Sequence, residues 1–281
     1  MGALDSQGIE FQGLDSQDSG SQGLSCRKVT HGAVAPRQPW LVCLHGLLGS
    51  GEDWLPVLPF CRDWPVLLVD LPGHGASRTI SATDFADVSR LLSETLREQG
   101  ITRYWLLGYS LGGRIAMYHA CNGQHDGMLG LLVEGGHPGL ATPELRTARI
   151  HHDVRWAQRF RHEPLPAVLQ DWYQQAVFAD VNSVQREQLI ARRSANHGAS
   201  VAAMLEATSL GRQPFLVDRL RHLSMPFIYL CGASDMKFQT LATQYGLPLL
   251  SVAQAGHNAH QANPAAYAER VRAFLLHHVK D

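Results

Sequence analysis

The residues around Ser110 have the types and spacing of a nucleophilic centre. Residues 108–112 read Gly-Tyr-Ser-Leu-Gly, which matches the pattern G-x-S-x-G. An apolar run at 104–107 precedes them, and a helix-compatible stretch at 113–121 follows. Glycines on both sides of a serine allow a sharp strand-to-helix turn that holds a strained backbone and exposes the hydroxyl. This context favours a nucleophile elbow over a glycine-rich turn with an incidental serine.

A serine hydroxyl needs a base, and the chain offers a histidine at a suitable place. His257 follows the last predicted strand and precedes a predicted final helix at 263–280, while Asp235 follows the apolar run at 227–230 through a short turn. One of fifteen histidines or an isolated turn aspartate would mean little alone. The order Ser, Asp, His is typical of hydrolases built on α/β sheets. We therefore predict a triad in which the His257 imidazole lies within hydrogen-bonding reach of the Ser110 hydroxyl.

Two backbone amides could stabilise an oxyanion beside this serine. Residues 45–49, His-Gly-Leu-Leu-Gly, end the first core strand and present the amide of Leu47, and the elbow presents the amide of Leu111. The loop 70–77 closes the next strand near the same edge. Its glycines and proline indicate a structural role, with His74 as a hydrogen-bonding residue of the loop and not a catalyst.

Arg114 is an unusual neighbour for a reactive serine. It lies four residues after Ser110, about one helical turn on, and so on the nucleophile's side of that helix. A positive charge at this place is costly unless an anion pairs with it. From the residues alone, an anionic substrate and a structural salt bridge explain Arg114 equally well.

The elements that must position these residues are predicted by short apolar runs, each ending in a glycine-rich or polar turn. Such runs are typical of strands buried on both faces of a parallel sheet. Helical spacing between them is clearest at 83–99. The alternation predicts the α/β class, with a mainly parallel central sheet flanked by helices, an α/β-hydrolase fold with an inserted helical cap. The predicted strands are 41–44, 66–69, 104–107, 129–133, 227–230 and 249–252.

The composition divides the chain into four segments. Residues 1–24 contain two near repeats rich in Gln, Ser, Gly and Asp, and we expect a disordered leader or tag there. Residues 25–138 form the first part of the core. Residues 139–214, which are helical in pattern and rich in Arg, Gln and aromatic residues, form the cap. Residues 215–281 form the second part of the core.

The charge balance limits the partners and the location. Charged residues make up 17% of the chain and the formal net charge is −1, so no global field attracts nucleic acid or an anionic membrane. No apolar stretch is long enough to span a membrane, and the N-terminus lacks a secretory pattern. The five cysteines lack metal-ligand spacing, which predicts free thiols, no metal and a cytoplasmic protein. We expect a monomer or a small homo-oligomer, and the sequence does not distinguish the two.

From about Trp40 to its C-terminus the chain closely resembles the 2-succinyl-6-hydroxy-2,4-cyclohexadiene-1-carboxylate synthases of menaquinone biosynthesis. The elbow and histidine motifs are shared by many hydrolases, whereas the cap motifs give the resemblance its specificity. The motifs are GYSLGGR (108–114), VEGGHPGL (133–140), RWAQRF (155–160), DWYQQ (171–175), MLEATSL (204–210) and AGHNAH (255–260).

The resemblance implies a lyase reaction on an α/β-hydrolase fold. The substrate of the family, 2-succinyl-5-enolpyruvyl-6-hydroxy-3-cyclohexene-1-carboxylate, loses pyruvate. By this resemblance, Ser110, activated by His257 and oriented by Asp235, removes a ring proton and does not attack a carbonyl. The resulting anion is held by the amides of Leu47 and Leu111. Neither a metal nor an organic cofactor is implied.

The resemblance also gives the arginines a function, because the substrate is a tricarboxylate. Arg114 matches a substrate-binding arginine of the family on the elbow helix, Arg149 matches a second and Arg193 matches a third. Tyr109 and Trp172 match aromatic positions that line the family's site.

Other interpretations remain for parts of this site. Without the resemblance, Arg149 and Arg193 would more often be solvated charges, and a shift of one position would exchange Arg193 with Arg192. The fold and triad alone also suit a serine esterase or thioesterase that uses the serine as a true nucleophile. A non-catalytic binding or scaffold protein is a third possibility, although the chain keeps all three triad members.

Overall fold

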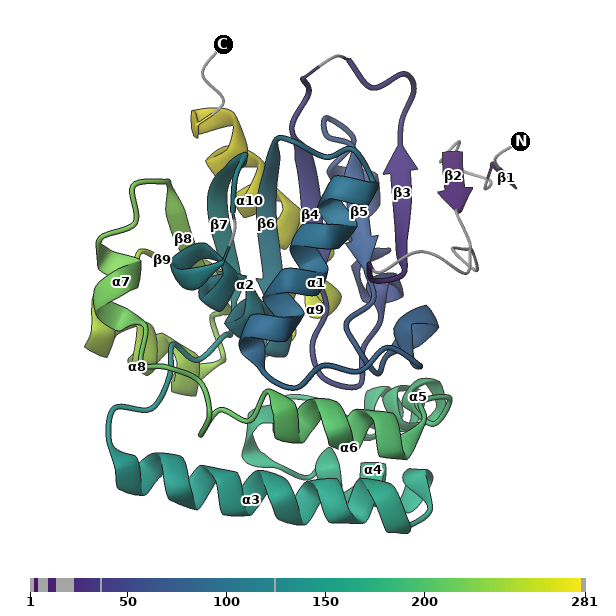
Figure 1. Ribbon diagram of the computed structural model, residues 1–281, viewed down its shortest axis with the longest axis vertical. Coiled ribbons are helices and arrows are strands. Elements are labelled where there is room, and N and C mark those ends of the chain that lie inside the picture. Colours follow the sequence, from purple (N-terminus) through teal and green to yellow (C-terminus); the bar gives the residue numbers. More distant parts are fainter. Residues whose placement is uncertain (1–2, 5–9, 14–22, 36, 124, 279–281) are drawn as a thin grey trace.

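The computed structural model describes residues 3–4, 10–13, 23–35, 37–123 and 125–278. Its centre is a nine-stranded sheet with the order β1-β2-β3-β5-β4-β6-β7-β8-β9. Strands β4 to β9 run parallel, whereas β1, β2 and β3 pair antiparallel at one edge (Figure 1). The bounds are β1 Ala3–Leu4, β2 Glu10–Gly13, β3 Cys26–Thr30, β4 Trp40–Leu44, β5 Val66–Val69, β6 Tyr104–Tyr109, β7 Met128–Glu134, β8 Phe227–Gly232 and β9 Leu249–Val252.

All six predicted strands are confirmed within two residues, and the antiparallel edge was missed. Strand β3 has three half-buried residues in five, so it lacks the continuous apolar run that reveals the central strands. The expected disordered leader is not found at β1 and β2, which are paired strands. An edge strand offers unpaired backbone groups, and backbone pairing needs no apolar side chains. At the end of the expected leader, Leu24 is buried and its N–H donates to Thr95 Oγ1 at 2.7 Å, so this residue belongs to the core. Residues 1–2, 5–9 and 14–22 lie outside the described ranges.

Helices cover both faces of the sheet, as the parallel topology requires. Along β4, Val42 and Leu44 point into the apolar layer that includes α1 and α2, and Leu41 and Cys43 point into the layer that includes α10. Figure 1 shows α1 and α2 in front of the sheet and α10 behind it. These helices are α1 Phe85–Glu98, α2 Leu111–Asn122, α7 Val217–Arg221, α8 Met236–Tyr245, α9 Ala259–Ala262 and α10 Pro264–His278.

Helix α1 shows how local sequence sets these boundaries. The Asp84 side chain accepts a hydrogen bond from the Asp87 N–H at 2.9 Å, so the helix begins at Phe85. Buried side chains such as Val88, Leu92 and Leu96 recur every four residues along the inner face. The helix predicted over 83–99 is therefore confirmed.

A separate group of helices lies across the carboxyl ends of the parallel strands (Figure 1). Their apolar side chains form a cluster of their own, with Phe160, Leu169 and Leu205 buried. All four lie within the segment 139–214, where we expected the cap. They are α3 Pro143–His162, α4 Leu165–Trp172, α5 Ser183–Arg193 and α6 Gly198–Ala207. No helix among the described residues is long and apolar enough to cross a membrane.

Candidate active site

Ser110 occupies a strained turn between β6 and α2, as the elbow motif predicts. Its backbone angles are φ 49° and ψ −106°, a conformation that L-residues rarely adopt. The turn closes tightly, because a Cβ on Gly112 would lie 2.3 Å from the Leu44 carbonyl oxygen. The N–H of Ser110 donates to the carbonyl oxygen of Glu134, at 2.8 Å, at the end of the neighbouring strand β7. The serine is thus fixed by the ends of three strands.

The acid and base of the predicted triad are bonded to each other. The Asp235 carboxylate, after β8, accepts a hydrogen bond of 2.9 Å from Nδ1 of His257, and both side chains are buried. Phe238 stacks on the imidazole, with ring centroids 4.9 Å apart. These contacts fix the ring orientation and leave Nε2 to face a substrate or the serine.

Ser110 and the His257 imidazole both contact the turn at the end of β7, at Glu134 and Gly135 respectively. Ser110 bonds the Glu134 carbonyl, and a Cβ on Gly135 would lie 2.8 Å from Cε1 of His257. No described residue, however, forms a hydrogen bond with the Ser110 hydroxyl. The expected bond between the Ser110 hydroxyl and His257 is therefore not formed in this structure. Hydrogen bonds between catalytic groups are often long in unliganded sites and shorten when substrate binds.

The backbone N–H groups of the two predicted oxyanion donors, Leu47 on the loop after β4 and Leu111 at the elbow, are unpaired among the described residues. Leu48, next to the first donor, has a φ of 67°, so the loop that carries it is strained and needs support. An unpaired amide beside a nucleophile is suited to an anionic oxygen.

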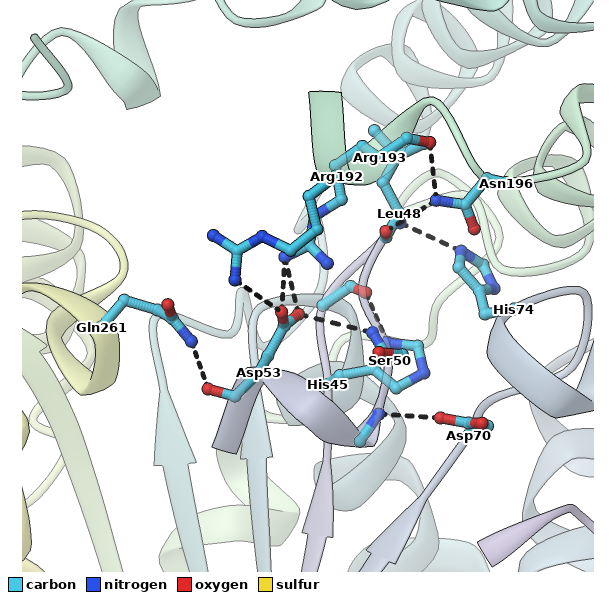
Figure 2. Close-up of polar contacts among 12 residues, drawn as sticks. His45, Leu48, Ser50, Asp53, Asp70, His74, Arg192, Arg193, Asn196 and Gln261 are labelled. Atoms are coloured by element: carbon cyan, nitrogen blue, oxygen red, sulfur yellow. Dashed lines mark hydrogen bonds and ion pairs between the residues drawn. The ribbon is translucent and has the colours of Figure 1, made fainter. Parts of the chain in front are cut away.

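Two buried histidines provide that support (Figure 2). Nε2 of His74 accepts the Leu48 N–H at 3.0 Å, and Nε2 of His45 accepts the Leu71 N–H at 2.9 Å. Each Nδ1–H therefore donates to a backbone carbonyl, of Pro72 and Gly46 respectively. Burial lowers the pKa of His74 to about 3, so the ring stays neutral as this pattern requires. The prediction that His74 is a loop residue and not a catalyst agrees with this geometry.

Arg193 is not a free cation, contrary to what the substrate-binding hypothesis led us to expect. Its Nη2 lies 2.7 Å from both carboxylate oxygens of Asp53, and both residues are buried (Figure 2). Burial raises the pKa of Asp53, but the charge and hydrogen bonds of Arg193 outweigh this effect and hold it below its usual value. Arg192 is exposed, and its Nη1 lies 4.0 Å from the same carboxylate. Arg193 is therefore the inward-facing member of the pair.

Arg114 differs from Arg193 because no described carboxylate pairs with it. Its side chain is buried, Nη1 donates to the Thr208 carbonyl oxygen at 2.7 Å, and the guanidinium lies 5.7 Å from the centre of the Phe85 ring. Burial and, to a smaller extent, the nearby charge of Arg149 lower the pKa of Arg114, the charge of Asp153 raises it, and together they bring it to about 9. Arg114 thus forms no salt bridge with a described residue, and the carboxylate whose charge acts on it, Asp153, is itself bonded to Arg149 and Ser209.

Arg149 lies close enough to Arg114 to affect its pKa, and it is itself partly paired. Its Nε lies 2.8 Å from Oδ1 of Asp153, whose other oxygen accepts a hydrogen bond from Ser209. One third of the Arg149 side chain is exposed. The pKa of His137 is lowered to about 3, mainly by burial and also by the positive charges of Lys237, Arg114 and Arg149. Arg114 of α2, Arg149 of α3 and Lys237 of α8 therefore lie close enough for all three charges to act on one imidazole.

The structure brings five of the ten predicted site residues, Leu47, Tyr109, Ser110, Trp172 and Arg193, to one small cavity. It measures about 70 Å³, and it includes the elbow, the oxyanion loop and aromatic residues of the cap. Asp235 and His257 line a second, larger cavity of about 380 Å³. Arg114 and Arg149 line neither of them. The lining of the small cavity is Gly46, Leu47, Asp53, Tyr109, Ser110, Trp172, Tyr173, Phe178, Leu189, Arg193, Asn258, His260 and Gln261.

Three buried residues beside the site were not predicted. Asp53 neutralises Arg193, and Glu134 accepts hydrogen bonds from His260 directly below Tyr109. The motifs VEGGHPGL and AGHNAH contain Glu134 and His260, so a signal for these two was present. Among the described residues, no group of His, Cys, Asp or Glu could hold a metal ion.

Comparisons with known proteins agree with this geometry. Residues 39–261 match the α/β-hydrolase fold family. A 2-succinyl-6-hydroxy-2,4-cyclohexadiene-1-carboxylate synthase from Pectobacterium atrosepticum is 85% identical over 253 residues, which cover 90% of this chain and all of the relative. The chain belongs to this synthase family. A synthase from Yersinia pestis is 62% identical over 256 residues, covering 90% of this chain and 94% of the relative.

Solved structures share the fold of this synthase family. MenH from S. aureus has 24% identity and a TM-score of 0.83, covering 91% of this chain and 99% of its own. A thermophilic esterase from Thermogutta terrifontis has 19% identity and a TM-score of 0.74, covering 99% and 98%. Because MenH and an esterase both match, the fold does not decide the reaction.

Proposed function

We propose that this chain, acting in the cytoplasm, eliminates pyruvate from 2-succinyl-5-enolpyruvyl-6-hydroxy-3-cyclohexene-1-carboxylate and forms 2-succinyl-6-hydroxy-2,4-cyclohexadiene-1-carboxylate in menaquinone biosynthesis. The observation that supports this most is Arg114, a buried cation without a carboxylate partner one helical turn from Ser110. Such a group suits an anionic substrate and gives no advantage with a neutral ester. The relatives that carry the synthase name supply the identity of that substrate.

In the proposed reaction Ser110 is a base and not a carbon nucleophile. Asp235 holds the Nδ1–H of His257, so Nε2 can accept the proton of the Ser110 hydroxyl. The alkoxide then removes a proton from the substrate ring, and the electron pair of that C–H bond moves toward the succinyl ketone. The ketone oxygen becomes an oxyanion, which the amides of Leu47 and Leu111 stabilise.

Collapse of the oxyanion completes the elimination. The electron pair returns through the ring and breaks the C–O bond to the enolpyruvyl group. The imidazolium of His257 gives its proton to the departing enolate, which becomes pyruvate, and the serine is already protonated by the ring hydrogen. Both groups are then restored, and no acyl-enzyme forms.

The three carboxylates of the substrate need positively charged partners, and the three arginines would contribute in different ways. Arg114 and Arg149 would bind carboxylates as charges, since the first lacks a counter-ion and the second is partly exposed. Arg193 would act as a hydrogen-bond donor, because Asp53 already balances its charge. Tyr109 and Trp172 would line the ring-binding part of the cavity.

The test is pyruvate release from the authentic intermediate, followed by coupled reduction of pyruvate with lactate dehydrogenase. We expect rapid release with the wild-type chain and nearly none with Ser110→Ala. Rapid hydrolysis of nitrophenyl or acyl-CoA esters without pyruvate release would instead establish the esterase. A folded sample that binds the intermediate and never consumes it would indicate a binding protein.

A further inference from the structure

A second buried carboxylate–imidazole pair lies beside the proposed triad. Nδ1 of His260 lies 2.9 and 3.0 Å from the two carboxylate oxygens of Glu134, and the backbone N–H of His260 donates to the same carboxylate at 3.2 Å. Glu134 is 0% exposed and His260 is 1% exposed. A buried carboxylate is costly unless several donors satisfy it, so these three contacts hold the two residues firmly together.

Glu134 is bonded at both its backbone and its side chain, and the two ends hold different parts of the site. Its carbonyl oxygen accepts the N–H of Ser110 at 2.8 Å. Its carboxylate binds the first turn of α9, three residues after His257. Gly135 then packs directly against the His257 ring. A single residue therefore connects the elbow that carries the serine to the loop that carries the base.

The side chain of His260 is wedged between rings, which makes this connection stiff. Its ring centroid lies 4.6 Å from that of Tyr109 and 4.6 Å from that of Trp54. Tyr109 also lies against His257, with centroids 5.4 Å apart. A rotation or shift of the His260 ring would thus move Tyr109 and the neighbouring loop together.

We propose that Glu134 and His260 are positioning residues that set the separation of the Ser110 hydroxyl and the His257 imidazole. This inference rests on the proposed roles of Ser110 and His257. Glu134 does not line the small cavity, and although His260 does, the role proposed for both is to fix positions and not to bind substrate. The contact between Glu134 and His260 instead fixes the position of the loop that carries His257 relative to the end of β7. Misplacement of a reacting group by about 1 Å can reduce a rate by about 10²-fold.

Variants of His260 can distinguish a role in positioning His257 from a general role in protein stability. They differ in which ring nitrogen of His260 is replaced by an amide nitrogen. In His260→Asn the side-chain amide keeps a donor near the place of Nδ1, whereas in His260→Gln the amide lies nearer the place of Nε2. We expect His260→Ala and His260→Gln to lower kcat about 10- to 100-fold, with KM within a factor of about 3. His260→Asn should recover most of the lost kcat.

Changes at Glu134 test the same connection from its other end. Glu134→Gln keeps one acceptor and should lower kcat less than Glu134→Ala does. When Glu134→Ala and His260→Ala are combined, the loss of kcat should be close to that of Glu134→Ala alone, because both changes break the same contact. Losses in kcat that multiply would indicate two independent roles and would overturn the proposal.

His119 offers a matched control far from the cavity. Its buried ring also bonds two side chains, with Nδ1 2.8 Å from Ser89 Oγ and Nε2 3.0 Å from the Tyr104 hydroxyl. His119→Gln should lower stability and leave kcat near the wild-type value. Wild-type kcat in His260→Ala, or equal losses in His260→Asn and His260→Ala, would overturn the proposal. If Ser110→Ala and His257→Ala kept activity, the proposed triad itself would be wrong.

Discussion

Nη2 of Arg193 lies 2.7 Å from both carboxylate oxygens of Asp53, across 140 positions of sequence. The bond connects α5 of the cap to the short 3₁₀ helix η1, Gly51–Trp54, of the core, next to the oxyanion loop. Asn196 strengthens this junction, since its amide donates to the Leu48 and Arg193 carbonyl oxygens, each at 3.0 Å. The cap is thus attached to the core at the edge of the site.

We expect Arg193→Ala to destabilise the protein by about 3–5 kcal/mol, because Asp53 would remain buried without its partner. The neighbouring change Arg192→Ala should cost less than about 0.5 kcal/mol, as the side chain is nearly half exposed. Urea unfolding of both variants measures the difference. Similar losses in the two would show that the buried pair is not the dominant contact.

Arg114→Ala should have the opposite profile, with a large loss of substrate use and little loss of stability. Its guanidinium has no described carboxylate to leave unpaired. We expect kcat/KM to fall at least about 10-fold, since one charge-assisted hydrogen bond is worth about 1.5–3 kcal/mol. Arg161→Ala, which breaks an ion pair with Glu206 on the cap, is the control and should leave kcat/KM unchanged. An unaltered kcat/KM in Arg114→Ala would exclude Arg114 from the substrate site.

Ser110→Ala and His257→Ala should each lower pyruvate release by about 10⁴-fold, because residues of a triad act as one unit. For the same reason, the variant that combines both changes should release pyruvate at nearly the same rate as either single variant. His222→Ala removes an exposed histidine on the core and serves as the control. Turnover at the wild-type rate in either single variant would contradict the assignment of the base and its partner.

The stability of the protein should decrease as the pH falls from about 6.5 toward 5. Burial lowers the pKa of His74 to about 3 and that of His119 to about 4, from an ordinary value of 6.5. Below pH 6.5 the unfolded chain binds protons that the folded chain excludes, so this contribution is complete above pH 6.5 and is lost on acidification. His119→Gln should reduce the dependence of the free energy of unfolding on pH in this range by up to about 1.4 kcal/mol per pH unit. Urea midpoints that stay constant from pH 7.5 to pH 5 would contradict this expectation.

The central strands and the elbow could be predicted because they depend on neighbours in sequence. Apolar runs that end in glycine identified β4 to β9, and G-x-S-x-G identified Ser110. The pairing of Asp235 with His257 followed from their places after consecutive strands, and the structure confirms it. These features are local or follow from the order of the strands.

The electrostatics of the site could not be predicted, because they depend on contacts between distant segments. Nothing near Arg193 indicates that Asp53 will neutralise it, and nothing near Arg114 indicates that it will lack a carboxylate. From the sequence, Arg114 fitted an anionic substrate and a salt bridge equally well, and Arg149 and Arg193 without the resemblance were expected to be solvated. In the structure Arg114 and Arg193 are buried and, of these two, only Arg193 pairs with a described carboxylate, whereas Arg149 is partly exposed. The antiparallel strand β3 was missed for a different reason, since its side chains are only partly buried.

The backbone of Ser110 has a further consequence for how the protein can evolve. A non-glycine residue at φ 49° and ψ −106° costs about 1–3 kcal/mol, and glycine adopts such angles freely. Ser110→Gly should therefore melt at a higher temperature than the wild type while losing the reactive hydroxyl. Selection for heat resistance alone would favour the inactive form, so the serine persists only where the product is needed.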